Sequence, residues 1–226
     1  MLTAALDTSV KPSFALCTED EIVIQDSYRT SKKRSETILL PWIKDMLDSQ
    51  DVTIDQIPRW LVGLGPGSFT GIRTGIALIK GFCSLSSREC HGIASSAALA
   101  WAAISRHHAN APVAVLHDGR RDQAILTKYE NTTSGLQELA PPEVIQRSQI
   151  PERTTDCPTL ITPHERFAEH LPDAVQDQLI ILPNVEAGDL LSYFLTDPLQ
   201  YHTFAAEHSE PIYVRPPAFV KPFSWK

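Results

Sequence analysis

Two aspartates could do phosphate chemistry, because each ends a strand-like apolar segment of the sequence. Asp7 and Asp118 stand at these two places. If the two segments are equivalent strands of a duplicated fold, the carboxylates would face a phosphate and its magnesium ion across a cleft, with Thr8 and Ser9 as phosphate contacts. Aspartates at strand ends also cap turns. Both interpretations remain open from the residues alone.

A glycine-rich stretch is a second candidate for anion binding. The apolar residues 60–64 predict a buried strand, Gly65 and Gly67 then break the pattern, and Ser68 is a good N-cap for a helix. The free N–H groups at such a helix start can bind an anion. The alternative is a tight turn that simply starts a packed helix. Neither the P-loop pattern Gly-x4-Gly-Lys-Ser/Thr nor Gly-x-Gly-x-x-Gly is present.

The sequence lacks the usual metal-binding and nucleophile patterns. The eight histidines include no His-x3-His pair, which would put two imidazoles on one helical face. The four cysteines show no Cys-x-x-Cys spacing, and no Gly-x-Ser-x-Gly elbow occurs. We therefore predict no metal site and no catalytic residue. We expect Cys17, Cys83, Cys90 and Cys157 to be free and mostly buried thiols.

Charge is unevenly distributed along the 226 residues. The formal net charge is −7, and all of it lies after residue 110. Such a chain has no general cluster of Lys and Arg with which to hold nucleic acid, so contact with RNA would be indirect, through a partner. No apolar run approaches the length of a membrane span, and no signal peptide is visible. These features predict a cytoplasmic protein.

The order of elements predicts an α/β fold of two similar halves. In the first half, three strand-like segments precede alternating helices and strands, as in ribonuclease-H-like and actin-like folds. The second half restarts with an equivalent pair of strands, which indicates an internal duplication. We therefore predict a duplicated two-lobe fold with lobes at 1–110 and 111–226. The expected strands are 2–7, 13–17, 22–28, 60–64, 88–93, 113–118, 124–129, 159–162 and 180–182, and the expected helices are 35–48, 68–86, 94–105, 163–171 and 187–195.

Two of these helices carry more apolar surface than one core-facing stripe requires. The helix 35–48 is apolar over a broad sector, and Pro41 should bend it or delay its start. In the helix 68–86 an apolar face recurs at three- and four-residue steps, while Gly71 and Gly75 leave a second face where another backbone could approach closely. An exposed apolar face of this size indicates a surface that binds another protein molecule. The predicted partner interface consists of Ile38, Leu39, Trp42, Ile72, Arg73, Ile76, Ile79 and Cys83.

The glycine stretch resembles the signature of the TsaB (YeaZ) family. It reads Gly-Pro-Gly-Ser-Phe-Thr-Gly-Ile-Arg-x-Gly-Ile from Gly65 and reaches a further glycine at Gly81. Two positions depart from the family pattern, since Arg34 stands where the family usually has His, and Gln123 where it usually has Glu. Further segments resemble the family at 5–9, 35–41, 92–100, Asp118-x-Arg120 and 211–215.

The resemblance implies an actin-like two-lobed protein without catalysis of its own. It implies that the two helices bind a TsaD-type transferase, that a TsaE-type ATPase joins the complex, and that two copies of the chain pair through the same helices. The products of this machinery are tRNAs that carry threonylcarbamoyladenosine beside the anticodon. No cofactor is expected, other than ATP or ADP at an interface with a partner. The alternatives are an ATP-dependent phosphotransferase or ATPase that uses Asp7 and Asp118, and a peptidase of the same superfamily.

Overall fold

The computed structural model describes residues 1–19, 21–28, 35–84, 88–196, 210–212 and 214. Its first half builds a five-stranded mixed sheet in the order β3-β2-β1-β4-β5. The first three strands form an antiparallel meander, and the last two run parallel to β1. The strands are β1 (Thr3–Asp7), β2 (Ser13–Cys17), β3 (Ile22–Ser27), β4 (Arg59–Gly63) and β5 (Glu89–Ile93).

The second half repeats this sheet. Its order is β10-β9-β6-β7-β8, so that β6 takes the place of β1 and the remaining strands follow with the same directions. The predicted duplication and the two-lobe α/β fold are therefore confirmed. The strands are β6 (Val113–Asp118), β7 (Gln123–Thr132), β8 (Gly135–Gln146), β9 (Thr159–Thr162) and β10 (Leu179–Ile181).

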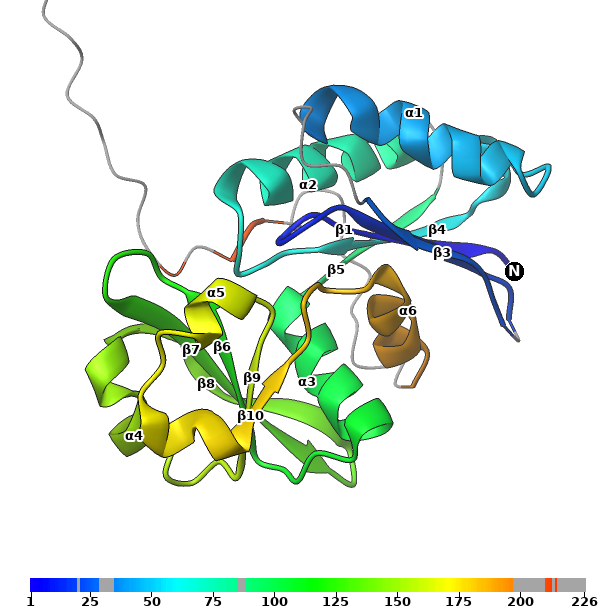
Figure 1. Ribbon diagram of the computed structural model, residues 1–226. Coiled ribbons are helices and arrows are strands. Elements are labelled where there is room, and N and C mark those ends of the chain that lie inside the picture. The colour runs from blue at the N-terminus through cyan, green and yellow to red at the C-terminus, as the bar shows by residue number, and fades with distance from the viewer. Residues whose placement is uncertain (20, 29–34, 85–87, 197–209, 213, 215–226) are drawn as a thin grey trace, which may run out of the picture.

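Helices cover both faces of each sheet (Figure 1). The outer face of the first sheet packs against α1 and α2, and the outer face of the second sheet packs against α4, α5 and the short 3-10 segments. Two helices, α3 and α6, lie between the sheets and pack against each other. The helices are α1 (Ser35–Asp48), α2 (Phe69–Ser84), α3 (Ser95–His107), α4 (Ile150–Arg153), α5 (Glu165–Ala168) and α6 (Ala187–Thr196), with 3-10 segments η1 (Ile54–Gln56), η2 (Arg147–Gln149) and η3 (Asp173–Gln178).

Alternation along the central strands explains this layering. Successive side chains of a strand point to opposite faces. In β1, Ala4 and Leu6 point to the α1–α2 layer, whereas Ala5 points to the α3–α6 layer. In β6, Ala114 and Leu116 point outward and Val115 points inward in the same way. Strands buried on both faces need apolar residues at almost every position, and these two segments have them.

The last helix ties the two halves together. Although α6 follows the second sheet in the chain, it packs on β1 and β2 of the first. The Glu186 carboxylate, just before α6, accepts hydrogen bonds from Ser27 Oγ at 2.6 Å and from Ser13 Oγ at 3.2 Å. The Ala187 N–H donates to Ser13 Oγ at 2.9 Å. The lobe boundary near residue 110 stays a prediction.

Most predicted elements are present, and two were missed. The first helix spans the predicted residues 35–48 with Pro41 inside it. The strand β8 was missed, because Pro141 and Pro142 interrupt its pattern, and the four-residue α4 was too short to recognise. All four cysteines are free and buried, as predicted. No helix in the described part of the chain is long and apolar enough to span a membrane.

Candidate functional site

The Asp7 carboxylate is fully buried and already has its hydrogen-bond donors. Its Oδ1 accepts hydrogen bonds from the Ser9 N–H at 2.7 Å and the Ser9 hydroxyl at 2.6 Å, and Oδ2 accepts one from the Ser95 hydroxyl at 2.6 Å. Burial raises the pKa of Asp7, while the bonds from Ser9 and Ser95 oppose that rise. Gly63 leaves the space in which this carboxylate lies, because a Cβ at Gly63 would come within 1.9 Å of Oδ2. Asp7 therefore does not face an open cleft.

The glycine turn packs against the loop that follows Asp7. Ser68 caps α2 as predicted, since its Oγ accepts a hydrogen bond from the Gly71 N–H at 3.2 Å. The Ser68 N–H donates to Ser9 O at 2.6 Å, and Thr8 Oγ1 donates to Gly71 O at 2.8 Å. A Cβ at Gly71 would lie 2.2 Å from Thr8 O, and one at Gly75 would lie 2.5 Å from Thr8 Oγ1. The backbone that approaches the glycine face is thus the chain's own Thr8–Ser9 loop.

This packing favours the tight turn over the anion site. The N–H groups of Ser68 and Gly71 already have acceptors within the chain, and the Gly65 N–H donates to Ser95 Oγ at 3.0 Å. The hollow that Thr8, Ser68 and their neighbours line has a volume of about 50 Å³, whereas pockets for small ligands start at roughly 300 Å³. Of the predicted nucleotide residues, the structure brings together Asp7, Thr8, Ser9, Gly65, Gly67 and Ser68, and only Gly67 and Ser68 are exposed.

The structural counterpart of Asp7 is His117, and the pairing of Asp7 with Asp118 was wrong by one position. Ala5 and Val115 both point inward, and the next inward positions are Asp7 and His117. The shift matters because one residue along a strand moves a side chain to the opposite face. Asp118 instead has a half-exposed side chain that caps its own turn, accepting a hydrogen bond from the Arg120 N–H at 2.9 Å. The two-carboxylate cleft is therefore not formed.

The His117 imidazole is neutral, and its hydrogen-bonding groups lack partners. Its ring is fully buried, and neither nitrogen has a hydrogen-bond partner among the described residues. The His164 ring stands edge-on to it, with the centroids 5.6 Å apart. Burial, with a further contribution from His164, lowers the pKa of His117 from 6.5 to about 3. A neutral imidazole cannot supply the negative charge that a magnesium ion requires.

Replacing the two strand-end aspartates should have unequal effects on stability. Asp7→Ala removes three hydrogen bonds and leaves two buried hydroxyls without an acceptor, so we expect it to lower the free energy of unfolding by about 2 kcal/mol. Asp118→Ala should lower it by about 1 kcal/mol or less, because the side chain is half exposed and its ion pair with Arg147 is long, at 3.4 Å. Urea unfolding at pH 7 measures both. Equal effects would contradict the structural role of Asp7.

The predicted partner interface needs correction. Ile72, Ile76 and Ile79 point into the core between α2 and the first sheet, together with Leu39 and Cys83. The prediction that these five residues form a partner interface was therefore wrong. The apolar face that the spacing indicates is the face that packs against the chain's own first sheet. Among the predicted set, Ile38 and Trp42 are half-buried and Arg73 is exposed.

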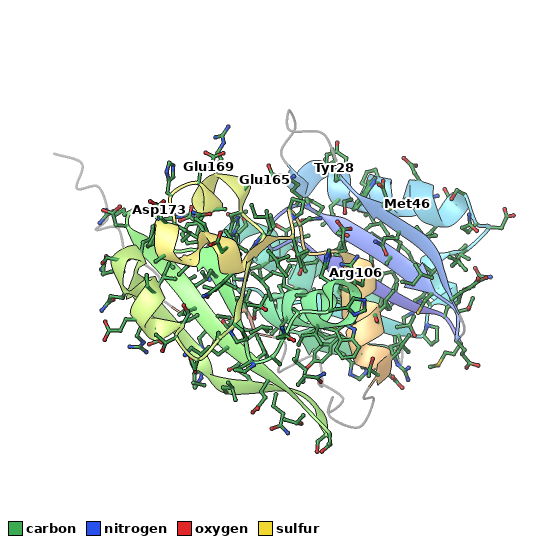
Figure 2. The ribbon with its side chains drawn as sticks, turned by 60° about the horizontal axis from the view of Figure 1, so that its bottom comes forward. Tyr28, Met46, Arg106, Glu165, Glu169 and Asp173 are labelled. Carbon is green, nitrogen blue, oxygen red and sulfur yellow. The ribbon has the colours of Figure 1, made fainter. Side chains whose placement is uncertain are left out.

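The outward face of α2 has a different composition. Phe69, Arg73, Ala77 and Gly81 recur at four-residue steps and are exposed. The Arg73 guanidinium lies over the Phe69 ring, 3.8 Å from its centroid. A Cβ at Gly81 would meet no described atom within 4 Å. We call these four residues the α2 outer stripe. On α1, Leu40 is 44% exposed, and Met46 lies near the end of the helix (Figure 2). Tyr28, which follows β3, packs edge-on against Trp42 of α1, with the ring centroids 5.6 Å apart.

Comparisons with known proteins agree with the fold. A family model described as TsaD: tRNA N6-adenosine threonylcarbamoyltransferase matches residues 28–159, more than half of the chain. The solved structure of YeaZ from Pseudomonas aeruginosa superposes with a TM-score of 0.75 at 25% identity, covering 94% of this chain and 99% of YeaZ. The chain belongs to the TsaD-type family and, within it, to the TsaB (YeaZ) group. The resemblance of the glycine stretch is thereby confirmed.

TsaB proteins of two bacteria align over nearly the whole chain. The protein named tRNA threonylcarbamoyladenosine biosynthesis protein TsaB from Escherichia coli is 23% identical over 95% of both chains. The protein of the same name from Haemophilus influenzae is 29% identical over 93% of this chain and 92% of its own length. Of the departures from the TsaB pattern, Arg34 lies outside the described residues, and Gln123 begins β7. In the matching segment 211–215, Ile212 donates its N–H to Leu64 O at 2.9 Å, whereas residues 213 and 215 lie outside the described part.

One group of polar residues was not singled out from the sequence. Arg147, Ser148 and His170 line an open groove in the second lobe. Arg147 follows a strand that was missed, and His170 stood in a segment without a recognisable motif, so no spacing pointed to them. Among the described residues, no group of three or more His, Cys, Asp or Glu side chains could hold a metal ion.

Proposed function

We propose that the chain is a non-catalytic TsaB-type subunit in the biosynthesis of threonylcarbamoyladenosine in tRNA. It docks a TsaD-type transferase, and a TsaE-type ATPase joins the complex, so that its contact with tRNA is indirect. Two copies pair through the same surface and compete with the transferase for it. Membership of the TsaB group and the names of the aligned relatives support the pathway.

The observation that carries the docking proposal is the α2 outer stripe. Ala77 and Gly81 present almost no side chain, so a partner helix could approach the α2 backbone closely there. Phe69, 40% exposed, and Arg73 stack on each other at one end and offer an aromatic ring with a cation. Small residues with an aromatic or arginine anchor are typical of tight helix–helix contacts and of binding hot spots.

The environment of Asp7 and His117 supports a non-catalytic role. Asp7 is saturated by Ser9 and Ser95, and its counterpart is the neutral His117. An ATPase would use strand-end carboxylates to hold magnesium, and neither inward position offers one to an open space. Among the described residues no contact favours the alternative of an ATP-dependent phosphotransferase. Calorimetry with Mg-ATP tests this alternative directly.

Ala77→Glu tests the docking surface. The substitution puts a carboxylate in the middle of the exposed stripe, so we expect the affinity for a TsaD-type partner to fall at least tenfold because the charge would be buried unpaired. The melting temperature should stay within about 2 °C, since surface substitutions are usually neutral. The affinity is measured by calorimetry with the purified partner, and the dimer fraction by sedimentation.

The matched control is Ala174→Glu, the same change at an exposed alanine of η3 in the other lobe. It should leave both affinity and dimerisation unchanged. If Ala77→Glu binds the partner as tightly as the control, the α2 outer stripe is not the docking surface.

A further inference from the structure

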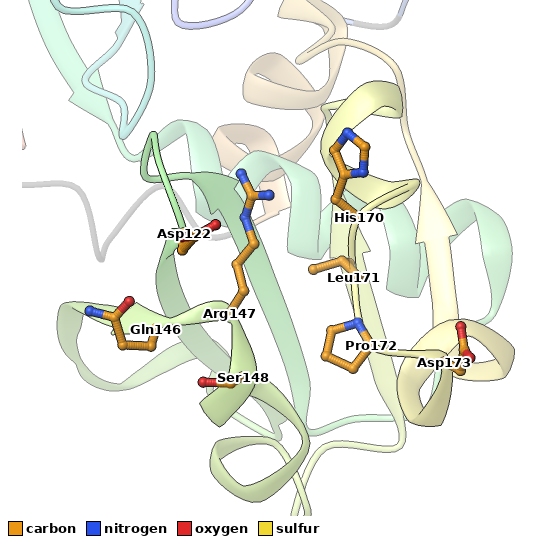
Figure 3. A pocket seen from close by; sticks show the side chains of 8 residues that line it. All are labelled: Asp122, Gln146, Arg147, Ser148, His170, Leu171, Pro172 and Asp173. Carbon is orange, nitrogen blue, oxygen red and sulfur yellow. The ribbon is translucent and has the colours of Figure 1, made fainter.

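The second lobe contains an open groove that the docking proposal does not use (Figure 3). Its volume is about 740 Å³, within the range of small-molecule sites. One wall carries Asp122, Arg147 and Ser148, and the opposite wall carries His170 and Asp173. The groove lies beside the β6–β7 turn, because the Arg147 N–H donates to Asp122 O at 2.8 Å.

Arg147 is the most unusual residue of this groove. Its side chain is only 19% exposed and lies over the Phe167 ring, 4.9 Å from the ring centroid. Its one acceptor among the described residues is Asp118 Oδ1, at a long 3.4 Å from Nη2, and its buried Nε has none. A guanidinium carries five N–H donors. A largely buried guanidinium with so few acceptors is costly unless a ligand supplies them.

Charges of both signs stand in the groove and beside it, although Arg120 and Arg121 do not line it. Arg120 and Arg121 are exposed in the turn next to Asp122, and none of the ion pairs found in the described part of the chain includes them. Asp122 and Asp173 stand at the rim and are exposed. A simple anion would be attracted by the arginines and repelled by the carboxylates. A ligand with a phosphate and several hydroxyl groups satisfies both, since guanidinium groups bind phosphate oxygens and carboxylates accept hydrogen bonds from hydroxyls.

We propose that this groove binds a ribose phosphate group, with the phosphate on Arg147, assisted by His170 and Ser148, and the ribose hydroxyls toward Asp122 or Asp173. The position of the Arg147 guanidinium over the Phe167 ring restricts its orientation, and the forked geometry of a guanidinium suits two-point binding of a phosphate. The ligand is either a free nucleotide or sugar phosphate, or one nucleotide of an RNA. The site is independent of the docking surface on α2.

Titration of the whole chain at low salt tests the ligand chemistry. The probes are ribose 5-phosphate, AMP, ribose and inorganic phosphate, followed by NMR shifts of the His170 ring and by calorimetry. We expect ribose 5-phosphate and AMP to bind more tightly than inorganic phosphate. Ribose should bind at least about tenfold more weakly than ribose 5-phosphate or AMP, because it lacks the charge-assisted hydrogen bonds of the phosphate. Competition by a tRNA transcript for the AMP site would identify RNA as the source, and its failure would leave the free sugar phosphate.

Variants locate the site. Arg147→Lys keeps the charge but loses the forked geometry, and it should weaken AMP binding about tenfold. His170→Ala changes an exposed residue, so it should weaken binding severalfold without affecting the fold. Arg153→Ala is the control, because Arg153 pairs with Glu143 and does not line the groove. Absence of AMP binding, equal binding of inorganic phosphate and AMP, or binding unchanged in both Arg147→Lys and His170→Ala would overturn the proposal.

Discussion

Gly71→Ala should lower the free energy of unfolding by about 3 kcal/mol, because the added methyl group would clash with the backbone of the Thr8–Ser9 loop, which hydrogen bonds hold in place. The new Cβ would lie 2.2 Å from the carbonyl oxygen of Thr8. The Thr8 hydroxyl is bonded to Gly71 O, and the next residue, Ser9, is bonded to the buried carboxylate of Asp7. Overpacking a rigid site typically costs 1–3 kcal/mol or more. Urea unfolding followed by circular dichroism measures the change.

The same substitution at Gly81 should have the opposite sign. Both residues are inside α2, but a methyl group at Gly81 would meet no described atom within 4 Å. Alanine is favoured over glycine in a helix by roughly 1 kcal/mol, so Gly81→Ala should raise the free energy of unfolding by about 0.5–1 kcal/mol. If Gly71→Ala proved as harmless as Gly81→Ala, the close contact between α2 and the Thr8 loop would not exist in solution.

This pair of variants bears on what the glycine stretch means. The resemblance to TsaB rests largely on Gly65, Gly67, Gly71 and Gly75, and the structure explains the last three of these by packing against Thr8 and Ser9. The motif therefore specifies how the first lobe is assembled. Of the α2 outer stripe, Phe69, Arg73 and Gly81 are also positions of the motif, and Ala77 is the one that the motif leaves unspecified. The docking surface therefore overlaps the motif but does not involve its packed glycines.

The hydrophobic periodicity of the sequence predicted the helices and strands of this chain better than it predicted which faces of them are exposed. The three- and four-residue spacing of Ile72, Ile76 and Ile79 correctly predicted an apolar face on α2, and the glycines correctly predicted a close backbone approach. Nothing in the spacing says whether the chain itself or another molecule covers such a face, because both need the same residues. Of the outer stripe, only Arg73 was part of the predicted interface, because Ala77 and Gly81 give no apolar signal.

The strand-end residues show a second limit of sequence interpretation. Matching the two halves by residue type paired Asp7 with Asp118, since both are aspartates. In the structure the inward counterpart of Asp7 is instead His117, because Ala5 and Val115 are the inward positions two residues before them. The inward sequence Ala5-x-Asp7 corresponds to Val115-x-His117, and only the buried neighbours on α3 and α6 make that visible.

His117 should make the protein sensitive to acid. Its pKa is about 3 in the folded chain against 6.5 for an unhindered histidine, so protons bind to the unfolded state first as the pH falls. The contribution of His117 to stability is therefore complete above pH 6.5 and is lost progressively as the pH falls toward 3. At pH 4 this difference in pKa lowers the free energy of unfolding by about 3 kcal/mol relative to pH 7. Unfolding by urea at pH 7 and at pH 4 measures this loss.

His117→Leu should remove most of this loss and should not lower stability at pH 7, since it replaces two buried nitrogens that lack partners with apolar atoms of similar volume. The difference between the wild type and the variant isolates His117 from the groups that face it, His164 and, beyond that ring, Asp118. The same difference also cancels the effect of Asp189, which has the opposite sign. Burial raises the pKa of Asp189 to about 6, so this carboxyl group favours the folded state as the pH falls.

The exposed histidine His107, at the end of α3, provides the matched control for this prediction. His107→Leu should leave the loss between pH 7 and pH 4 unchanged, because the His107 side chain is exposed to solvent in the folded chain. If His117→Leu lost as much stability in acid as the wild type, the imidazole would have to find water or another partner when charged. The inward end of β6 would then be open to solvent, which would contradict the full burial of the His117 ring.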